Sequence, residues 1–170
     1  MQTCRKLNND TPERGSGRRR DTARERAIRL LAGREHGHRE LTRKLIDRGF
    51  EPAEVERVVD ELAESNLQSD ARYAEMLSRA RAGRGYGRRR VQVELTQAGV
   101  CPATINTALE AGDTDWVEVA VSALAKKFRN NPKADAASQQ KQRKHLYARG
   151  FDSSEIAAAV KQFSQSKEFA

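Results

Sequence analysis

The chain has few of the residues that build a thick globular core, a disulfide framework or a membrane span. Of its 170 residues, 37% are hydrophobic and 5% aromatic, which is enough only for thin cores between helices. Cys4 and Cys101 are the only cysteines, and neither has a histidine or second cysteine at metal-ligand spacing. No apolar run approaches the ~20 residues of a membrane-spanning helix, and the N-terminus lacks a signal-peptide core. We expect a cytoplasmic protein with reduced thiols, no membrane contact, no metal and no cofactor.

The sequence also lacks the motifs of common enzymes. It has no nucleophile elbow, no HExxH pair and no cysteine matched to a histidine. His36 and His38 are two residues apart, so they fall on different faces of a helix and offer no metal geometry by themselves. Asp113 and Asp115 are a close acidic pair that fits a loop and a helix N-cap equally well. We predict no catalytic residue, and a small metal-dependent nuclease is the enzymatic alternative.

What the chain does have is an excess of positive charge. It contains 32 lysines and arginines against 24 aspartates and glutamates, a formal net charge of +8 at pH 7. This balance favours a polyanionic partner, while a merely solubilising charge is the alternative interpretation.

A threefold repeat organises the apolar residues. The helix-stop pairs Gly49-Phe50, Gly99-Val100 and Gly150-Phe151 recur at spacings of 50 and 51 residues. Apolar residues precede each stop at helical spacing, except that Gln142 stands in the third copy where Leu41 stands in the first. Each copy is too small to bury its own faces well, so the pattern predicts an all-α fold, an elongated array of three tandem three-helix repeats. A compact bundle of the same helices is the structural alternative.

The predicted organisation begins with a basic flexible tail at residues 1–21. The three repeats follow, and a short C-terminal tail ends the chain; their predicted ranges are 22–68, 69–112, 113–165 and 166–170. Thr22 with Glu25 and Asp152 with Glu155 have the spacing of capping boxes. Asp70 is expected to be the N-cap of the first helix of the second repeat.

Basic residues cluster in the second repeat. Between residue 79 and Glu94 the chain has no acidic residue but six arginines: Arg79, Arg81, Arg84, Arg88, Arg89 and Arg90. The planar fork of arginine suits phosphate because it donates two parallel hydrogen bonds, although a solvated helix face is the alternative interpretation. The third helix of the first repeat is acidic instead, so the chain can present faces of opposite charge.

The turn Gly85-Tyr86-Gly87 interrupts this arginine run. Glycines let a backbone approach a partner closely, and an exposed tyrosine could stack on a base or fill a protein pocket. Tyr86 could equally pack onto the apolar side of its own repeat. The turn is not a phosphate loop, because it lacks the GKS/T ending and a preceding strand.

Taken together, these residues resemble the RecX family of recombination regulators. The stretch from Gly85 through Arg90-Val91 and Glu94-Leu95 to Gly99-Val100 carries the resemblance, with Tyr147 to Phe151, and the likeness covers roughly residues 22 to 163. It implies a non-enzymatic protein of tandem three-helix repeats that binds the RecA recombinase filament. It further implies that the protein lies in the filament groove, inhibits ATP hydrolysis and strand exchange, and favours filament loss, and that some members bind DNA.

The resemblance also suggests where contacts lie. Gly85, Tyr86, Gly87 and Arg90 match the central motif as candidates for contact, whereas Val91 and Leu95 are expected to be structural. We predict a monomer that contacts the RecA filament and single-stranded, or also double-stranded, DNA. The predicted contact residues are Arg79, Arg81, Arg84, Gly85, Tyr86, Gly87, Arg88, Arg89, Arg90, Lys144 and Arg149. A stand-alone DNA-binding protein of helical repeats is the alternative.

Overall fold

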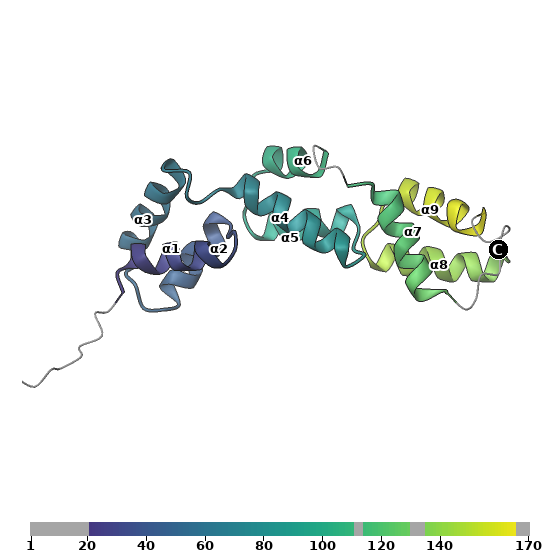
Figure 1. The fold of residues 1–170 in the computed structure, drawn as a ribbon, viewed down its shortest axis with the longest axis horizontal. Coiled ribbons are helices and arrows are strands. Elements are labelled where there is room, and N and C mark those ends of the chain that lie inside the picture. Colours follow the sequence, from purple (N-terminus) through teal and green to yellow (C-terminus); the bar gives the residue numbers. More distant parts are fainter. Residues whose placement is uncertain (1–20, 111–113, 130–134, 166–170) are drawn as a thin grey trace, which may run out of the picture.

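The computed structural model describes residues 21–110, 114–129 and 135–165, and the regular structure in these ranges is entirely helical. The helices are α1 (Ala23–Gly33), α2 (His38–Ile46), α3 (Pro52–Glu64), α4 (Asp70–Gly83), α5 (Arg88–Gln97), α6 (Pro102–Glu110), α7 (Trp116–Lys127), α8 (Ala136–Ala148) and α9 (Ser153–Gln165). Figure 1 shows them as three units in an extended row: unit 1 is α1–α3, unit 2 is α4–α6 and unit 3 is α7–α9. The predicted all-α array of three-helix repeats is confirmed. Both predicted tails, apart from Asp21, lie outside the described residues.

Each unit has an apolar core of its own, and Trp116 at the start of α7 packs into the core of unit 2. Leu41, Leu45 and Val59 lie in the core of unit 1, and Val91 and Leu95 lie in that of unit 2. The core of unit 3 surrounds Leu124, Leu146 and Phe151 and is a separate cluster. The helices are therefore not merged into the compact bundle that was the alternative. Gln142 is buried at the register of Leu41, as the imperfect third copy predicted.

The second helix of every unit ends in the predicted glycine stop. Gly49, Gly99 and Gly150 have φ angles of 87°, 81° and 84°, a left-handed conformation that glycine adopts without a Cβ clash. The next residue then donates its N–H back to the helix, for example Phe50 to the Leu45 carbonyl at 3.4 Å and Phe151 to the Leu146 carbonyl at 3.2 Å. These are Schellman motifs, in which orphan carbonyls of the last turn are satisfied.

Two predicted capping boxes are present, and one predicted cap is wrong. Thr22 and Glu25 exchange their hydrogen bonds, as do Asp152 and Glu155. The N-cap of α4 is Ser69 rather than Asp70, because the Ser69 hydroxyl accepts from the Arg72 N–H at 3.3 Å. Sequence alone could not show that the Asp70 carboxylate bonds to unit 1 instead.

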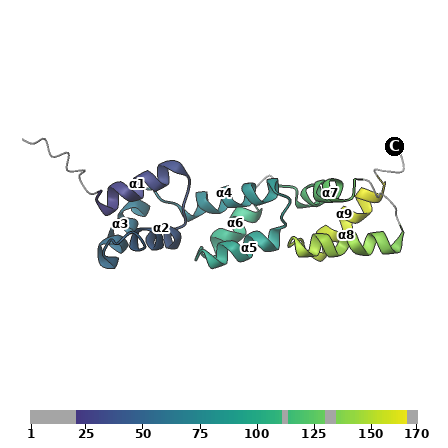
Figure 2. The same ribbon diagram turned by 90° about the horizontal axis from the view of Figure 1, so that it is seen from below.

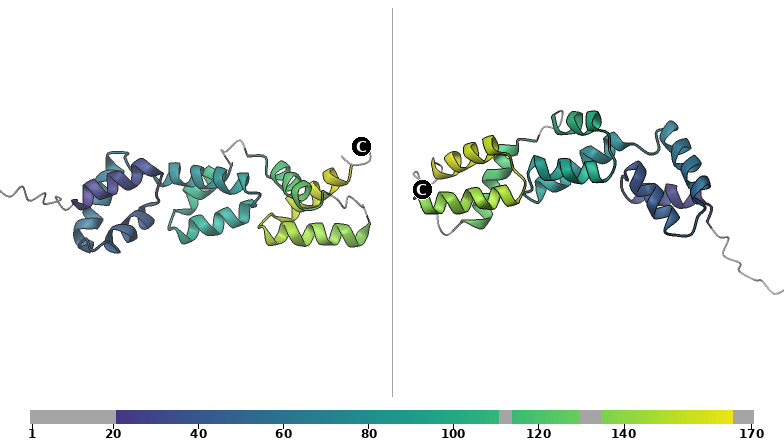
Figure 3. Two further views of the ribbon diagram at one scale, coloured as in Figure 1. Left: turned by 60° about the horizontal axis from the view of Figure 1, so that its bottom comes forward. Right: turned by 180° about the vertical axis from the view of Figure 1, so that it is seen from behind.

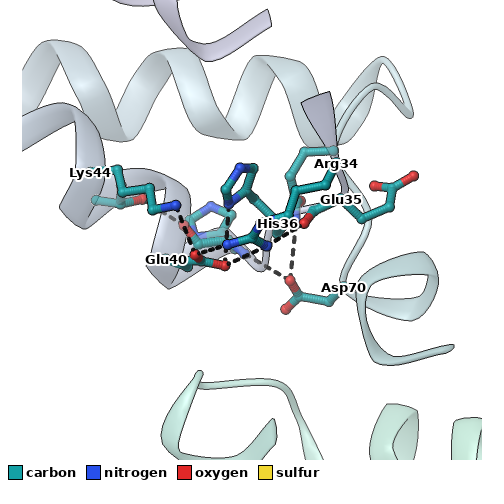
Figure 4. A network of polar contacts seen from close by, with 9 residues as sticks. Arg34, Glu35, His36, Glu40, Lys44 and Asp70 are labelled. Atoms are coloured by element: carbon teal, nitrogen blue, oxygen red, sulfur yellow. Dashed lines mark hydrogen bonds and ion pairs between the residues drawn. The ribbon is translucent and has the colours of Figure 1, made fainter. Parts of the chain in front are cut away.

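A polar network joins unit 1 to unit 2, at what we call the first junction (Figure 4). The Asp70 carboxylate accepts from the His38 N–H at 2.8 Å, and the Gln68 side-chain amide donates to the His36 carbonyl at 3.1 Å. Arg72 donates to Glu35 at 2.6 Å. The loop between α1 and α2 is thus held against the start of α4 mainly by side chains.

The second helices follow one another along one edge of the molecule. Figures 2 and 3 show α2, α5 and α8 in a row, with α1, α4 and α7 in a second row opposite. Within this row the end of α5 lies against the start of α2, since a Cβ placed on Gly99 would fall 1.8 Å from Cδ of Arg39. The end of α8 meets the start of α5 in the same way, so the row runs head to tail through the molecule.

Candidate nucleic-acid interface

The Gly85-Tyr86-Gly87 turn lies where unit 2 meets unit 3, at what we call the second junction. The Gly87 N–H donates to the Arg149 carbonyl and the Arg89 N–H donates to the Gly150 carbonyl, each at 2.9 Å. A Cβ on Gly87 would lie 2.4 Å from the Phe151 nitrogen, so only glycine allows this approach. The close approach that the sequence indicated is therefore made to the third unit of the same chain.

Gly85 ends α4 in a fourth Schellman motif. Its φ is 73°, and the Tyr86 N–H donates to the Arg81 carbonyl at 3.0 Å. Both Gly85 and Gly87 are buried in the second junction. Their contacts described above lie within the chain, and a role in contacting a partner stays a prediction.

Tyr86 is half-buried between two guanidinium groups. Its ring centroid lies 4.7 Å from Cζ of Arg90 and 5.4 Å from Cζ of Arg149. Arginine cations above an aromatic ring are attracted by its quadrupole, and the attraction grows as water is excluded. The ring thus bridges α5 and the end of α8, an arrangement that neither sequence interpretation of Tyr86 described.

Arg149 and Arg81 make bonds that hold the second junction and unit 2 together. Nη1 of Arg149 donates to the carbonyls of Arg84 and Gly85 at 3.0 and 3.1 Å, where a cation suits the negative end of α4. Arg81 donates to Glu94 at 2.7 Å with both side chains mostly buried. DNA contact by either arginine remains a prediction.

Three further arginines of the predicted set have acidic neighbours. Arg90 donates to Glu94 at 3.1 Å, Arg88 lies 3.7 Å from Glu110, and Arg79 lies 4.0 Å from Glu75. Arg79 also lies on α4, in the opposite row of helices from α5 (Figure 2). The stretch is acid-free in sequence, but the fold brings carboxylates to it.

The remaining predicted cations are Arg84, Arg89 and Lys144. All three are exposed, and within the described part of the chain none of them forms an ion pair. Arg89 and Lys144 lie in the row of second helices, on α5 and α8. Their charges are available to an outside anion without breaking a bond within the described structure.

The first turn of α5 has the opposite charge from that usually found at a helix N-terminus, where acidic residues are favoured. Three arginines occupy its first turn, no acidic residue does, and its N-cap Gly87 has no side-chain hydrogen bond to give. The N-terminus of a helix carries partial positive charge and disfavours cations, although the negative C-terminal end of α8, which lies against it, offsets part of this cost. The N–H groups of Gly87 and Arg89 are already bonded to the end of α8, so an outside phosphate would meet the three guanidinium side chains and relieve the repulsion among them.

Basic residues continue along the whole row of second helices, which we call the basic edge. The three helices contain nine lysines and arginines and two acidic residues, and α8 has no acidic residue at all. The basic residues are Arg39, Arg43, Lys44, Arg88, Arg89, Arg90, Lys141, Arg143 and Lys144. On α3, by contrast, five carboxylates accompany the single cation Arg57. The two signs of charge that the sequence indicated are thus concentrated on different helices.

The list of predicted contact residues omitted Tyr147, Arg143 and the cations of α2. Tyr147 is 65% exposed, the most exposed large hydrophobic side chain among the described residues. Its sequence position carried the signal, because Gln142 and Leu146, four residues apart, mark the core face of α8 and Tyr147 lies off that face.

The described ranges were also compared with the requirements of a metal site and of a membrane span. Across residues 21–110, 114–129 and 135–165, no three histidine, cysteine, aspartate or glutamate side chains gather where they could hold a metal. No helix within these ranges is long and apolar enough to cross a bilayer. Asp115 caps α7 by accepting from the Val117 and Glu118 N–H groups, while Asp113 lies outside the described residues.

Comparison with known proteins matches all three units to one family. Residues 23–62 match the profile described as "RecX, first three-helix domain", residues 69–109 the second and residues 113–160 the third. A protein named "Regulatory protein RecX" from Chromohalobacter salexigens is 40% identical over 139 residues, 82% of this chain and 91% of that protein. A protein of the same name from Xanthomonas axonopodis pv. citri is 37% identical over 150 residues, 88% of this chain and 93% of that protein.

A solved structure has the same fold. The crystal structure of RecX from Lactobacillus salivarius superposes with a TM-score of 0.70 at 20% identity, covering 84% of this chain and 95% of that one. At this identity the likeness concerns the architecture of three-helix units.

Proposed function

The chain belongs to the RecX family of regulatory proteins, and on this premise we propose that it binds a RecA-type recombinase filament on single-stranded DNA. It inhibits the filament's ATPase and strand exchange and favours its disassembly. The observation that carries the proposal is the basic edge, which runs along three units of an extended molecule. The regulatory names of its relatives support a role without catalysis.

An extended molecule suits a polymeric partner. Three units in a row can touch more than one filament subunit, whereas a compact protein of equal length would reach only one. Binding that favours one arrangement of neighbouring subunits over another shifts the equilibrium that ATP turnover requires. The basic edge would lie beside DNA phosphates, and the acidic α3 offers a surface of opposite sign to a protein partner.

The proposal includes the state and place in which the protein acts. It acts as a monomer in the cytoplasm, where the recombinase and its DNA are found. It needs no metal and no cofactor, because its effect comes from binding alone.

The test is the steady-state ATPase of recombinase on single-stranded DNA, titrated with this protein. We expect the rate to fall at sub-stoichiometric ratios and further at equal ratios. Arg57→Ala, which removes an exposed cation of α3 that is already paired with Glu61, is the control and should inhibit like the wild type. A rate that stays unchanged at a saturating dose would rule the proposal out.

A stand-alone DNA-binding protein is the second candidate, and the basic edge favours it too. The two differ in the partner that is preferred. Binding to naked single-stranded DNA as tight as to recombinase-coated DNA would support the second candidate, and tighter binding to the coated DNA would support the first.

A further inference from the structure

Two tyrosines lie near the second junction, and their surroundings differ. Tyr86 has guanidinium groups at 4.7 and 5.4 Å and is half-buried. Tyr147, on α8, is 65% exposed, and its one cation–π neighbour is Arg89, with Cζ at 6.0 Å from the ring centroid. That distance is at the outer limit of such contacts, so the Tyr147 ring is open to an outside partner.

Tyr147 separates two grooves on the basic edge. On one side the groove runs between α5 and α8 and is lined by Arg89, Arg90 and Val93. On the other side the groove runs between α8 and α9 and is lined by Arg143, Lys144 and Ile156. The ring belongs to the lining of both grooves, with cations on each side of it.

The charge of these grooves is positive. Glu94 is the one acidic residue in the lining of the first groove, and it is already bonded to Arg81 and Arg90. The second groove has no acidic residue in its lining. Arg89, Arg143 and Lys144 form no ion pair within the described residues, so they can receive an anionic partner.

An exposed ring between unpaired cations matches the chemistry of a single nucleic-acid strand. Such a strand alternates phosphates with bases whose faces are open, and base–aromatic stacking tolerates any sequence. A duplex offers the same phosphates but keeps its bases stacked inside. An acidic peptide would use the cations and leave the ring without a matching planar group.

We propose that Tyr147 stacks on a base of single-stranded DNA, whose flanking phosphates are held by Arg89 on one side and by Lys144 or Arg143 on the other. The inference rests on the proposed function, in which the DNA of the filament is single-stranded. The main-chain bonds of the second junction fix the start of α5 against the end of α8. The spacing between Arg89 and Tyr147 is therefore set before DNA arrives, which reduces the ordering cost of binding.

The test compares two oligonucleotides of equal length with the purified full-length protein, by fluorescence anisotropy. One is oligothymidylate, and the other has the same phosphates but abasic sugars. Stacking of one base on one ring contributes about fivefold to a hundredfold in affinity. We expect the wild type to prefer oligothymidylate by a factor in this range, Tyr147→Ala to lose the preference, and Tyr147→Phe to keep it.

Matched variants separate stacking from charge. Ile46→Ala removes the side chain at the equivalent position of α2, which is 38% exposed, and should leave the preference unchanged. Lys144→Ala should weaken both oligonucleotides alike and make the salt dependence shallower, by up to about 0.7 in the logarithmic slope. Circular dichroism checks that each variant is folded, as expected for an exposed side chain.

Two results would overturn the inference: equal wild-type affinity for both oligonucleotides, or a Tyr147→Ala variant that keeps the preference. Tighter binding of an acidic peptide than of oligothymidylate would also overturn it, in favour of a protein ligand. If the oligonucleotide test fails but the protein inhibits the ATPase, the proposed function stands without the stacking site. A base preference without ATPase inhibition would instead remove the proposed function and keep the stacking site.

Discussion

At the scale of single residues, the glycines that end the three second helices have different surroundings. A Cβ on Gly49 would meet no atom within 4 Å, whereas one on Gly150 would lie 2.7 Å from Cβ and 2.8 Å from the backbone nitrogen of Arg90. Gly99 faces the side chain of Arg39, which can rotate away. All three residues share the same left-handed backbone, so the difference comes from what the neighbouring unit places against them.

This difference predicts the effect of alanine at each position. Gly49→Ala should lower the free energy of unfolding by about 1–2 kcal/mol, the ordinary cost of a left-handed non-glycine residue. Gly150→Ala should cost clearly more, because α5 must move and the bond from Arg89 to Gly150 is lost. Urea denaturation of both variants measures this. Equal destabilisation would show that the second junction does not depend on the close contact.

At the scale of the helix, the positive charge at the start of α5 lowers the stability of the free protein and favours an anionic partner. Its first turn contains Arg88, Arg89 and Arg90 at the positive end of the helix dipole. Arg88 and Arg90 have carboxylates nearby, but Arg89 has no ion pair within the described residues. Replacing Arg89 therefore breaks no ion pair within the described residues, so its effects on stability and on DNA binding can be measured directly.

Replacing Arg89 should move stability and DNA binding in opposite directions. Arg89→Ala removes a cation from the helix N-terminus and should raise the free energy of unfolding by at most about 0.3–1 kcal/mol, because the end of α8 offsets part of the repulsion. It should also weaken binding to single-stranded DNA and reduce the salt slope by about 0.7. Denaturation and salt-dependent anisotropy measure the two effects, with Arg57→Ala as the control. A less stable variant with an unchanged salt slope would contradict this account.

Helix limits could be predicted from sequence because their signals are local. The glycine stops, Pro52 and the capping box at Thr22 act within a few residues, and the structure places them as expected. The prediction of Asp70 as the N-cap of α4 is wrong because its carboxylate accepts from His38, which lies 32 residues away in sequence. Tyr86 depends on contacts between units 2 and 3, so local pattern could not tell that its ring is enclosed, whereas the position of Tyr147 on its helix did indicate an open ring.

At the scale of the whole molecule, three separate cores give three units that can respond differently to pH. In unit 1, burial raises the pKa of Glu40, but hydrogen bonds from Arg34 and Lys44 outweigh it and lower the pKa to about 2 (Figure 4). In unit 3, burial raises the pKa of Glu155, while the N–H of Glu155 lowers that of Asp152. Burial lowers the pKa of His36 in unit 1 and of His145 in unit 3, so the histidines do not distinguish these units.

Unit 1 should therefore be the most sensitive to acid. The stability that ionised Glu40 contributes is present above its unfolded pKa of 4.5 and is lost as the pH falls towards about 2. The loss amounts to roughly 3 kcal/mol at most. Amide hydrogen exchange at about pH 5 and about pH 3, corrected for intrinsic rates, should show protection falling most in α1–α3.

Glu40→Gln provides the control for this prediction. It should lower the protection of unit 1 at about pH 5 and leave it with a smaller pH dependence, because the titrating group is gone. An equal loss of protection in all three units of the wild type would contradict the assignment to Glu40.

The main-chain character of the second junction has an evolutionary consequence. The bonds from Gly87 to Arg149 and from Arg89 to Gly150 use backbone atoms alone, so exposed side chains of units 2 and 3 outside this contact can change while the pose of the two units is inherited. Unit 1 is attached through the side chains of Asp70, Gln68 and Arg72, and a substitution at any of these three positions removes a bond between the units. Descendants of such a protein can alter the setting of the N-terminal unit to suit a changing partner without disturbing the pair that follows it.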